Sequence, residues 1–157
     1  MLLRRFFVVS GKGVSKNSGL MAFDRALHDA GVSQCNLVCV SSILPAGAKM
    51  IKPVEITPGS VTFTVLSRED GRGGEDITAG IGWVFCSRGG KDSYGLVVED
   101  HGNKNAEECK RDIGRKLAEM ADAREMTVAA FDTKIATLSG IPKNGYGCVV
   151  AALVYVE

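Results

Sequence analysis

The chain has 157 residues, of which 45% are hydrophobic and 24% charged, which suits one globular domain with a single core. Its 19 basic and 18 acidic residues give a formal net charge of +1 and are dispersed, so no basic face for nucleic acid or an anionic membrane is expected. The first apolar run ends at Ser10, short of a signal-peptide core, and no segment reaches the ~20 apolar residues that span a bilayer. We therefore expect a cytoplasmic protein with no nucleic-acid or membrane partner.

Apolar and alternating runs predict seven strands, interrupted by two amphipathic helices. In chain order these are a strand over 5–10, a helix over 18–31, strands over 36–41, 60–67, 78–87 and 94–99, a helix over 105–125, and strands over 127–137 and 146–156. Two well-separated helices among so many strands favour an α+β fold, with two layers of sheet and a helix outside each.

The first predicted helix carries a carboxylate where an apolar side chain is expected. Its cap is Asn17 or Ser18, and helical spacing places positions 20, 23, 24, 27 and 31 on one buried stripe, where Leu, Phe, Asp, Leu and Gly stand. A carboxylate on an apolar stripe needs a cation or hydrogen bonds. Two partners are open for Asp24: a local pair with Arg25 or His28, or a cationic ligand.

The second predicted helix begins near Asn105, with acidic residues in its first turn. Its apolar residues recur at helical spacing, so one side of this helix is expected to cover a sheet. The residues on that side are Cys109, Ile113, Leu117 and Met120 or Ala121.

Neither the cysteines nor the glycine-rich segments indicate a metal or nucleotide site. The charged segment "REDGRGGED", residues 68–76, predicts a mobile hairpin loop and lacks the Gly-Lys-Ser/Thr of a P-loop. The cysteines are odd in number, lie mostly in apolar runs and show no Cys-x-x-Cys spacing, so we expect reduced, buried thiols and no metal site. They are Cys35, Cys39, Cys86, Cys109 and Cys148.

Two polar residues stand at the ends of predicted strands. In "SYGLVVEDHG" the apolar run ends at Glu99, so this carboxylate lies at the lip of a mostly buried strand, where a raised pKa would let it handle a proton. The simpler alternative is a strand-end acid that faces water. Asn36 opens its strand five residues before Ser41, a position at which asparagine usually forms a turn.

The pair Ser41 and Ser42 follows a strand and precedes a Pro-Ala-Gly turn. Such hydroxyls often only cap the backbone. If the peptide is strained and its carbonyl polarised, however, Ser42 Oγ can attack the Ser41 carbonyl and form an ester. Elimination then cuts the chain, and hydrolysis with loss of ammonia leaves a pyruvoyl ketone, which can form a Schiff base and act as an electron sink.

The stretch "FDRALHDAGVSQCNLVCVSSILPAG", residues 23–47, resembles the pyruvoyl-dependent arginine decarboxylases, in which a Phe-Asp helix, an Asn-Leu strand and a Ser-Ser-Ile-x-Pro turn follow one another at this spacing. The resemblance continues through "YGLVVEDHG", the second helix and the closing "GCVVAALVYVE", and so covers nearly the whole chain. It implies a four-layer α-β-β-α sandwich and a homotrimer with active sites between neighbouring subunits.

Applied residue by residue, the resemblance implies cleavage between Ser41 and Ser42, with residues 1–41 as a β chain and 42–157 as an α chain that carries the pyruvoyl cofactor at position 42. Asn36 would stabilise the oxyanion formed during cleavage, and Glu99 would return a proton to the α-carbon after CO₂ leaves. Asp24 would bind the guanidinium of L-arginine, and the product would be agmatine.

The sequence departs from the family pattern in its short amino terminus, in Arg25 and His28, and in Ala46 and Gly47 after the turn proline. A cation beside Asp24 competes for its carboxylate. Two alternatives therefore stay open: a pyruvoyl enzyme that decarboxylates another amino acid, and a trimeric protein that binds a cationic metabolite and never cleaves.

Overall fold

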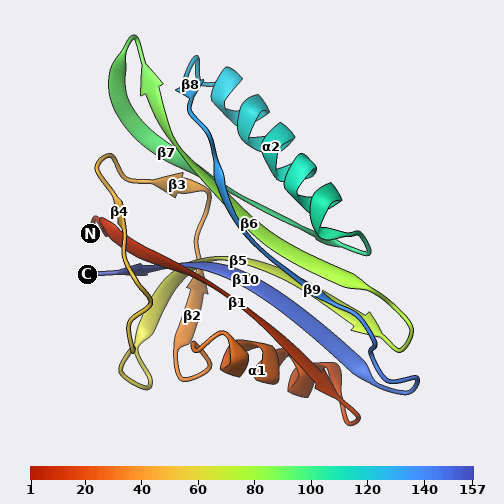
Figure 1. The fold of residues 1–157 in the computed structure, drawn as a ribbon. Coiled ribbons are helices and arrows are strands. Elements are labelled where there is room, and N and C mark those ends of the chain that lie inside the picture. The colour runs from red at the N-terminus through yellow and green to blue at the C-terminus, as the bar shows by residue number, and fades with distance from the viewer.

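The chain forms ten strands and two helices in a computed structural model that describes all 157 residues (Figure 1). Their bounds are β1 Arg5–Ser15, α1 Gly19–Asp29, β2 Asn36–Cys39, β3 Ile43–Leu44, β4 Lys49–Met50, β5 Val61–Arg72, β6 Ile77–Arg88, β7 Lys91–Gly102, α2 Ala106–Asp122, β8 Thr127–Val128, β9 Asp132–Leu138 and β10 Tyr146–Val156. The strands form two sheets, and the fold is a single α+β domain, as expected.

The first sheet has the strand order β2-β5-β10-β1-β4, and the second has β3-β7-β6-β8 with β9 also paired to β6. In the first sheet β10 is antiparallel to both β1 and β5, and β1 pairs with it along its whole length, from Arg5 opposite Val156 to Ser15 opposite Tyr146. In the second sheet β6 lies antiparallel to β7 and β9. The first and last strands of the chain therefore lie side by side (Figure 1).

Four hydrophobic clusters hold these elements together, and three of them have nine or ten buried residues. The largest joins residues of both sheets, including Phe6, Val65 and Leu153 of the first and Ile81 and Val97 of the second. A second cluster joins α1 to the first sheet, and a third joins α2 to the second sheet. Side chains of β10 alternate between the first two clusters, as the two faces of a strand require, so α1 and the second sheet contact opposite faces of β10.

Helix α2 forms as its sequence predicts. Asn105 caps it: its side chain accepts from the amide of Glu108, and the Glu108 side chain accepts from the amide of Asn105, which is a capping box. The expected apolar side is confirmed, because Cys109, Ile113, Leu117 and Ala121 are all buried.

Helix α1 has the expected Ser18 cap, but the predicted buried stripe is wrong. The buried residues are Ala22 and Ala26, whereas Leu20 is 73% exposed and Asp24 is exposed. The reason lies in β1, where Gly11 and Gly13 face the helix.

A Cβ added at Gly11 would clash with the backbone of Ala26, and one added at Gly13 would clash with the backbone of Ala22. The helix therefore approaches the sheet too closely for large side chains at the contact. Alanines occupy it, and the larger Phe23 and Leu27 pack at its sides.

Two strand predictions also need correction. Residues 68–72 belong to β5, because they pair with β10, so the expected hairpin loop shrinks to residues 73–76. The strand expected over 127–137 is two strands, β8 and β9, both of which pair with β6.

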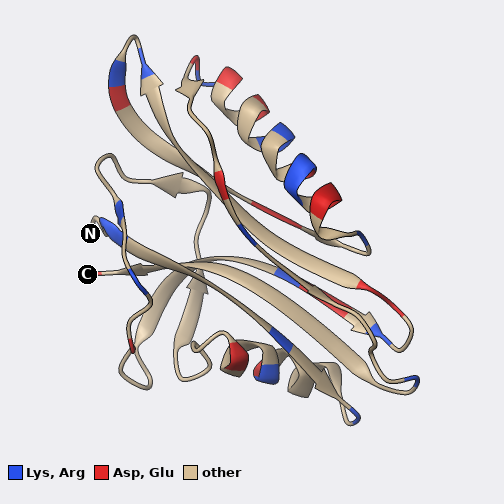
Figure 2. Ribbon diagram, in the orientation of Figure 1, with Lys and Arg blue, Asp and Glu red and all other residues tan.

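Charged residues of both signs are interspersed over the domain, and they alternate along α2 (Figure 2). No single-sign face is seen in this view, in line with the dispersed charges of the sequence. Neither helix has the length and apolar character needed to cross a bilayer.

Candidate functional site

The Ser41-Ser42 pair lies where the chain leaves β2 of the first sheet and enters β3 of the second (Figure 1). Ser41 is exposed and Ser42 is half-buried. The carbonyl of Ser42 accepts a hydrogen bond of 2.8 Å from the amide of Val97 in β7. The next carbonyl, of Ile43, accepts one of 2.9 Å from the hydroxyl of Tyr155 in β10. The residues on either side of the Ser42–Ile43 peptide are thus tied to both sheets.

Ser42 and Glu99 line the same pocket, which has a volume of about 390 Å³. Val98, Met120 and Ala123 form its apolar wall, and Lys116, Glu119 and Arg124 bring charges from α2 and the turn after it. Of the five predicted site residues, the fold therefore brings two into this pocket, Ser42 and Glu99.

A second pocket, of about 330 Å³, lies beside the same segment and is mostly apolar. Ser41 and Ile43 line it, whereas Ser42 lines the first pocket, as expected where successive side chains of an extended chain point to opposite sides. Tyr155 is also part of its wall, and burial raises the pKa of this tyrosine to about 12.

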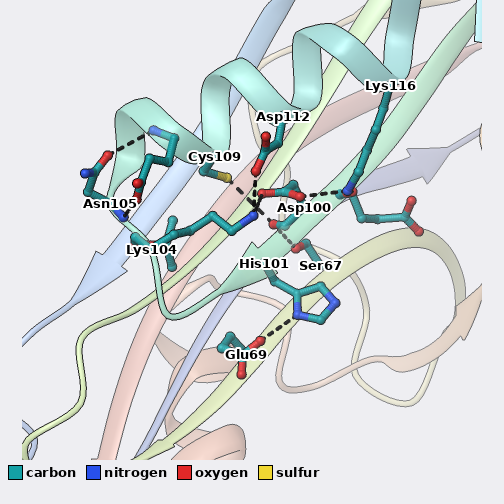
Figure 3. Close-up of polar contacts among 12 residues, drawn as sticks. Ser67, Glu69, Asp100, His101, Lys104, Asn105, Cys109, Asp112 and Lys116 are labelled. Carbon is teal, nitrogen blue, oxygen red and sulfur yellow. Dashed lines mark hydrogen bonds and ion pairs between the residues drawn. The ribbon is translucent and has the colours of Figure 1, made fainter. Parts of the chain in front are cut away.

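The backbone of Glu99 is fixed by a lysine from α2. Lys116 Nζ donates to the carbonyl oxygen of Glu99 at 2.8 Å and to Asp100 Oδ1 at 2.7 Å. Asp100 is only 4% exposed, and its other carboxylate oxygen accepts from Lys104 at 2.9 Å. Lys104 also pairs with Asp112 of α2 at 2.7 Å (Figure 3).

The charges of this network stabilise one another. Burial by itself would raise the pKa of the Asp100 carboxyl, but hydrogen bonds from Lys116 and Lys104 outweigh it and hold that pKa below its ordinary value. The hydrogen bonds that Lys104 donates to Asp112 and Asp100 in turn hold the pKa of Lys104 above its ordinary value. The network therefore keeps a carboxylate ionised inside the domain, next to Glu99.

Asn36 and Asp24 lie outside the pocket of their own chain. Asn36 opens β2, and its side-chain amide donates to the carbonyl of Gly59 at 2.9 Å. Asn36 lies six positions before Ser42, so the two residues are up to ~20 Å apart along an extended chain.

The local ion pair considered for Asp24 is not formed. Arg25 instead donates to the carbonyl of Val14, and the nearest polar neighbour of His28 is Ser33, at 3.5 Å. Asp24 thus has no cation of its own chain, and it stands exposed on α1.

Two residues of this region were not predicted from the sequence. Lys116 belongs to the charged side of α2, and its pattern is that of a surface lysine. Tyr155 could have been found from the sequence, because it lies on the same side of the last strand as Ala151 and Leu153. A tyrosine buried among apolar residues needs a hydrogen-bond partner for its hydroxyl.

Comparisons with known proteins show the family of the chain. The family model described as pyruvoyl-dependent arginine decarboxylase matches residues 5–157. A pyruvoyl-dependent arginine decarboxylase of Methanopyrus kandleri is 33% identical over 153 residues, which cover 97% of this chain and 96% of the relative.

Two further relatives are each named pyruvoyl-dependent arginine decarboxylase 2. That of Archaeoglobus fulgidus is 32% identical over 87% of this chain and 95% of the relative. That of Methanosarcina acetivorans is 34% identical over 99% and 98%, respectively. The match spans both sheets, both helices and the serine pair, and the chain belongs to the pyruvoyl-dependent arginine decarboxylase family.

Proposed function

We propose that this chain is a pyruvoyl-dependent decarboxylase that converts L-arginine to agmatine and CO₂ after it cleaves itself between Ser41 and Ser42. The family and the names of the relatives support the activity. The structural observation that carries the proposal is the pocket lined by both Ser42 and Glu99, because it unites the cofactor-forming serine with a candidate proton donor.

Cleavage would begin when Ser42 Oγ attacks the carbonyl carbon of Ser41, so that the peptide becomes an ester and the Ser42 amine is freed. Elimination releases Ser41 as a carboxylate and leaves dehydroalanine at 42, and water then replaces its nitrogen, which departs as ammonia. The products are a β chain of residues 1–41 and an α chain of residues 42–157. Their separation is opposed by β1, which pairs with β10 along its whole length, and by α1, which packs on the same sheet.

The residues around Ser42 suit a pyruvoyl group, which supplies a ketone for the substrate amine and an electron sink for decarboxylation. Glu99 lines the same pocket and would deliver a proton to the substrate α-carbon after CO₂ leaves. Val98, Met120 and Ala123 would limit water around the reacting carboxylate, where loss of charge favours its departure.

The remaining two assignments require more than one subunit. We propose a homotrimer, which the family resemblance implies, of four-layer α-β-β-α protomers. The clusters that join α1, the two sheets and α2 support the four layers of the protomer. Asp24 would bind the guanidinium at the pocket of a neighbouring subunit, through the paired hydrogen bonds that a carboxylate offers an arginine. To stabilise the oxyanion, the Asn36 side chain would have to break its hydrogen bond with the Gly59 carbonyl or act at the site of a neighbouring subunit.

The proposal is tested by incubating the purified protein with arginine labelled in its carboxyl carbon. We expect labelled CO₂ and agmatine in equal amounts from the wild type, and neither from Ser42→Ala. Other amino acids assayed in parallel decide the substrate. A fully cleaved protein that releases CO₂ from none of them would refute the proposal, and so would arginine-dependent release by the Ser42→Ala protein.

A further inference from the structure

Lys116 connects the candidate active site to an ion-pair network around the buried Asp100. It lines the pocket with Ser42 and Glu99, yet its ammonium donates to the carbonyl of Glu99. The same ammonium also donates to the carboxylate of Asp100 (Figure 3). The lysine belongs to α2, whereas Glu99 and Asp100 belong to β7. Its contacts therefore tie the helix to the strand at the residue proposed to move the proton.

Asp100 makes this tie strong, since its side chain is 5% exposed and both of its oxygens bind lysines. The second lysine, Lys104, reaches Asp112 on α2 and so ties the same strand to the same helix again. A buried carboxylate is very unfavourable without such partners. The arrangement holds only while α2 and the end of β7 keep their relative positions.

Hydrogen bonds hold the carbonyls of two successive residues, Glu99 and Asp100. Lys116 holds the carbonyl of Glu99, and the Ser67 hydroxyl, at 2.9 Å, and the Cys109 thiol, at 3.8 Å, donate to the carbonyl of Asp100. Successive side chains of a strand point to opposite faces, so Asp100 turns into the network while Glu99 turns to the pocket.

From this geometry we propose that Lys116 is a positioning residue for Glu99, and that Asp100 holds Lys116 in place. The inference rests on the proposed function, in which Glu99 delivers the proton. Lys116 lines the pocket, but its ammonium is bound to the Glu99 carbonyl and to Asp100, so its loss acts on the Glu99 carboxyl group through the backbone. A misplacement of about 1 Å at a reacting group can lower a rate about 100-fold.

Three variants separate positioning from charge balance. Lys116→Met keeps the apolar stem and removes the donor, and Lys110→Met makes the same change at an exposed lysine of α2. The double variant D100N/K116M removes both the donor and the buried charge that it neutralises. All three retain Lys104 and its pair with Asp112.

For K116M we expect a lower Tm and a kcat about 10- to 100-fold below that of the wild type, with KM changed less than about threefold. The double variant should regain much of the Tm, because no carboxylate is left short of a partner, but its kcat should stay low. K110M should match the wild type in Tm and kcat. A kcat that recovers together with Tm in the double variant would overturn the inference, because Lys116 would then only neutralise Asp100.

A second measurement needs no activity. Hydrogen exchange of the 97–101 segment, measured on the uncut Ser42→Ala protein, should be faster with K116M and unchanged with K110M. Unchanged exchange in K116M would overturn the inference. A wild type that cleaves but decarboxylates nothing would instead count against the proposed function, while the exchange result still decides whether Lys116 holds this segment.

Discussion

Replacing Tyr155 by Phe removes one hydroxyl and leaves a ring of nearly the same shape in the core between the sheets. Tyr155 is 7% exposed, and its hydroxyl donates to the carbonyl of Ile43, the residue directly after Ser42. The neighbouring carbonyl, of Ser42, is held by Val97 of the opposite sheet. The change therefore removes one of the hydrogen bonds that fix the segment in which cleavage is proposed.

The expected magnitude follows from the geometry of that hydrogen bond. A carbonyl left without a partner destabilises by about 1–3 kcal/mol if water is excluded. Ile43 is 41% exposed and this hydrogen bond is only partly buried, so the lower value, about 1 kcal/mol, is expected. This corresponds to a Tm lower by about 2–4 °C for a domain of this length. If the same free energy is lost from the reacting geometry, cleavage slows about fivefold.

Thermal unfolding of the uncut Ser42→Ala background measures the first effect, and the rate at which full-length protein disappears in the parent measures the second. Tyr94→Phe is the matched control, because Tyr94 is partly buried and packs against the α2 cluster instead. A Tyr155→Phe protein with wild-type Tm and cleavage rate would refute the argument that this hydroxyl anchors the segment.

The same variant has a pH signature. Burial raises the pKa of Tyr155 to about 12, above the ordinary value of 10.0. A group whose pKa is raised on folding stabilises the protein below its unfolded pKa, and this contribution is lost as pH rises through the folded pKa. The wild type should therefore lose more stability than Tyr155→Phe between pH 10 and about 12, as followed by denaturant titration across that range.

Three further changes test the other assignments. Glu99→Gln should lower kcat about 10²- to 10⁴-fold, the usual contribution of a general acid, and steady-state kinetics with equal activity to the wild type would exclude Glu99 as the donor. Asp24→Ala should cleave fully but raise KM for arginine about 10- to 100-fold, the effect of losing a hydrogen bond to a charged group; an unchanged KM would remove Asp24 from the substrate site. Because the pKa of Asp100 is lowered on folding, its contribution is complete above the unfolded pKa of ~3.9 and is lost as pH falls through the folded value. Asp100→Asn should therefore flatten the acid limb of the stability curve, and an unaltered limb would contradict the pairing with Lys104 and Lys116.

Sequence periodicity predicts the buried face of one helix and not of the other. In α2 the large apolar residues recur on one side and Asn105 supplies the cap, so periodicity and capping rules predict both its start and its buried face. In α1 the same rule fails, since Gly11 and Gly13 of β1 let the helix approach closely and make Ala22 and Ala26 the buried residues. A contact set by glycines elsewhere in the chain leaves no periodic signal in the helix.

The residues of the candidate site likewise include some that the sequence predicts and one that it does not. Ser42 and Glu99 were predicted from a family motif and a strand end, and the fold places both in one pocket. Lys116 was not predicted, because its contacts with Asp100 join a helix to a strand 16 residues earlier and its neighbours on α2 are exposed charges. Residues that act through the tertiary arrangement of two elements look like ordinary surface residues in the sequence.

Intact mass spectrometry of the denatured protein tests most directly whether Ser42 becomes a pyruvoyl group. We predict two polypeptides, one that ends at Ser41 and a larger one that begins at position 42. The larger polypeptide should be lighter than a chain that begins with serine, because a pyruvoyl group has replaced that serine. A single full-length mass after prolonged incubation would contradict the claim and favour a protein that binds a cationic metabolite without cleavage.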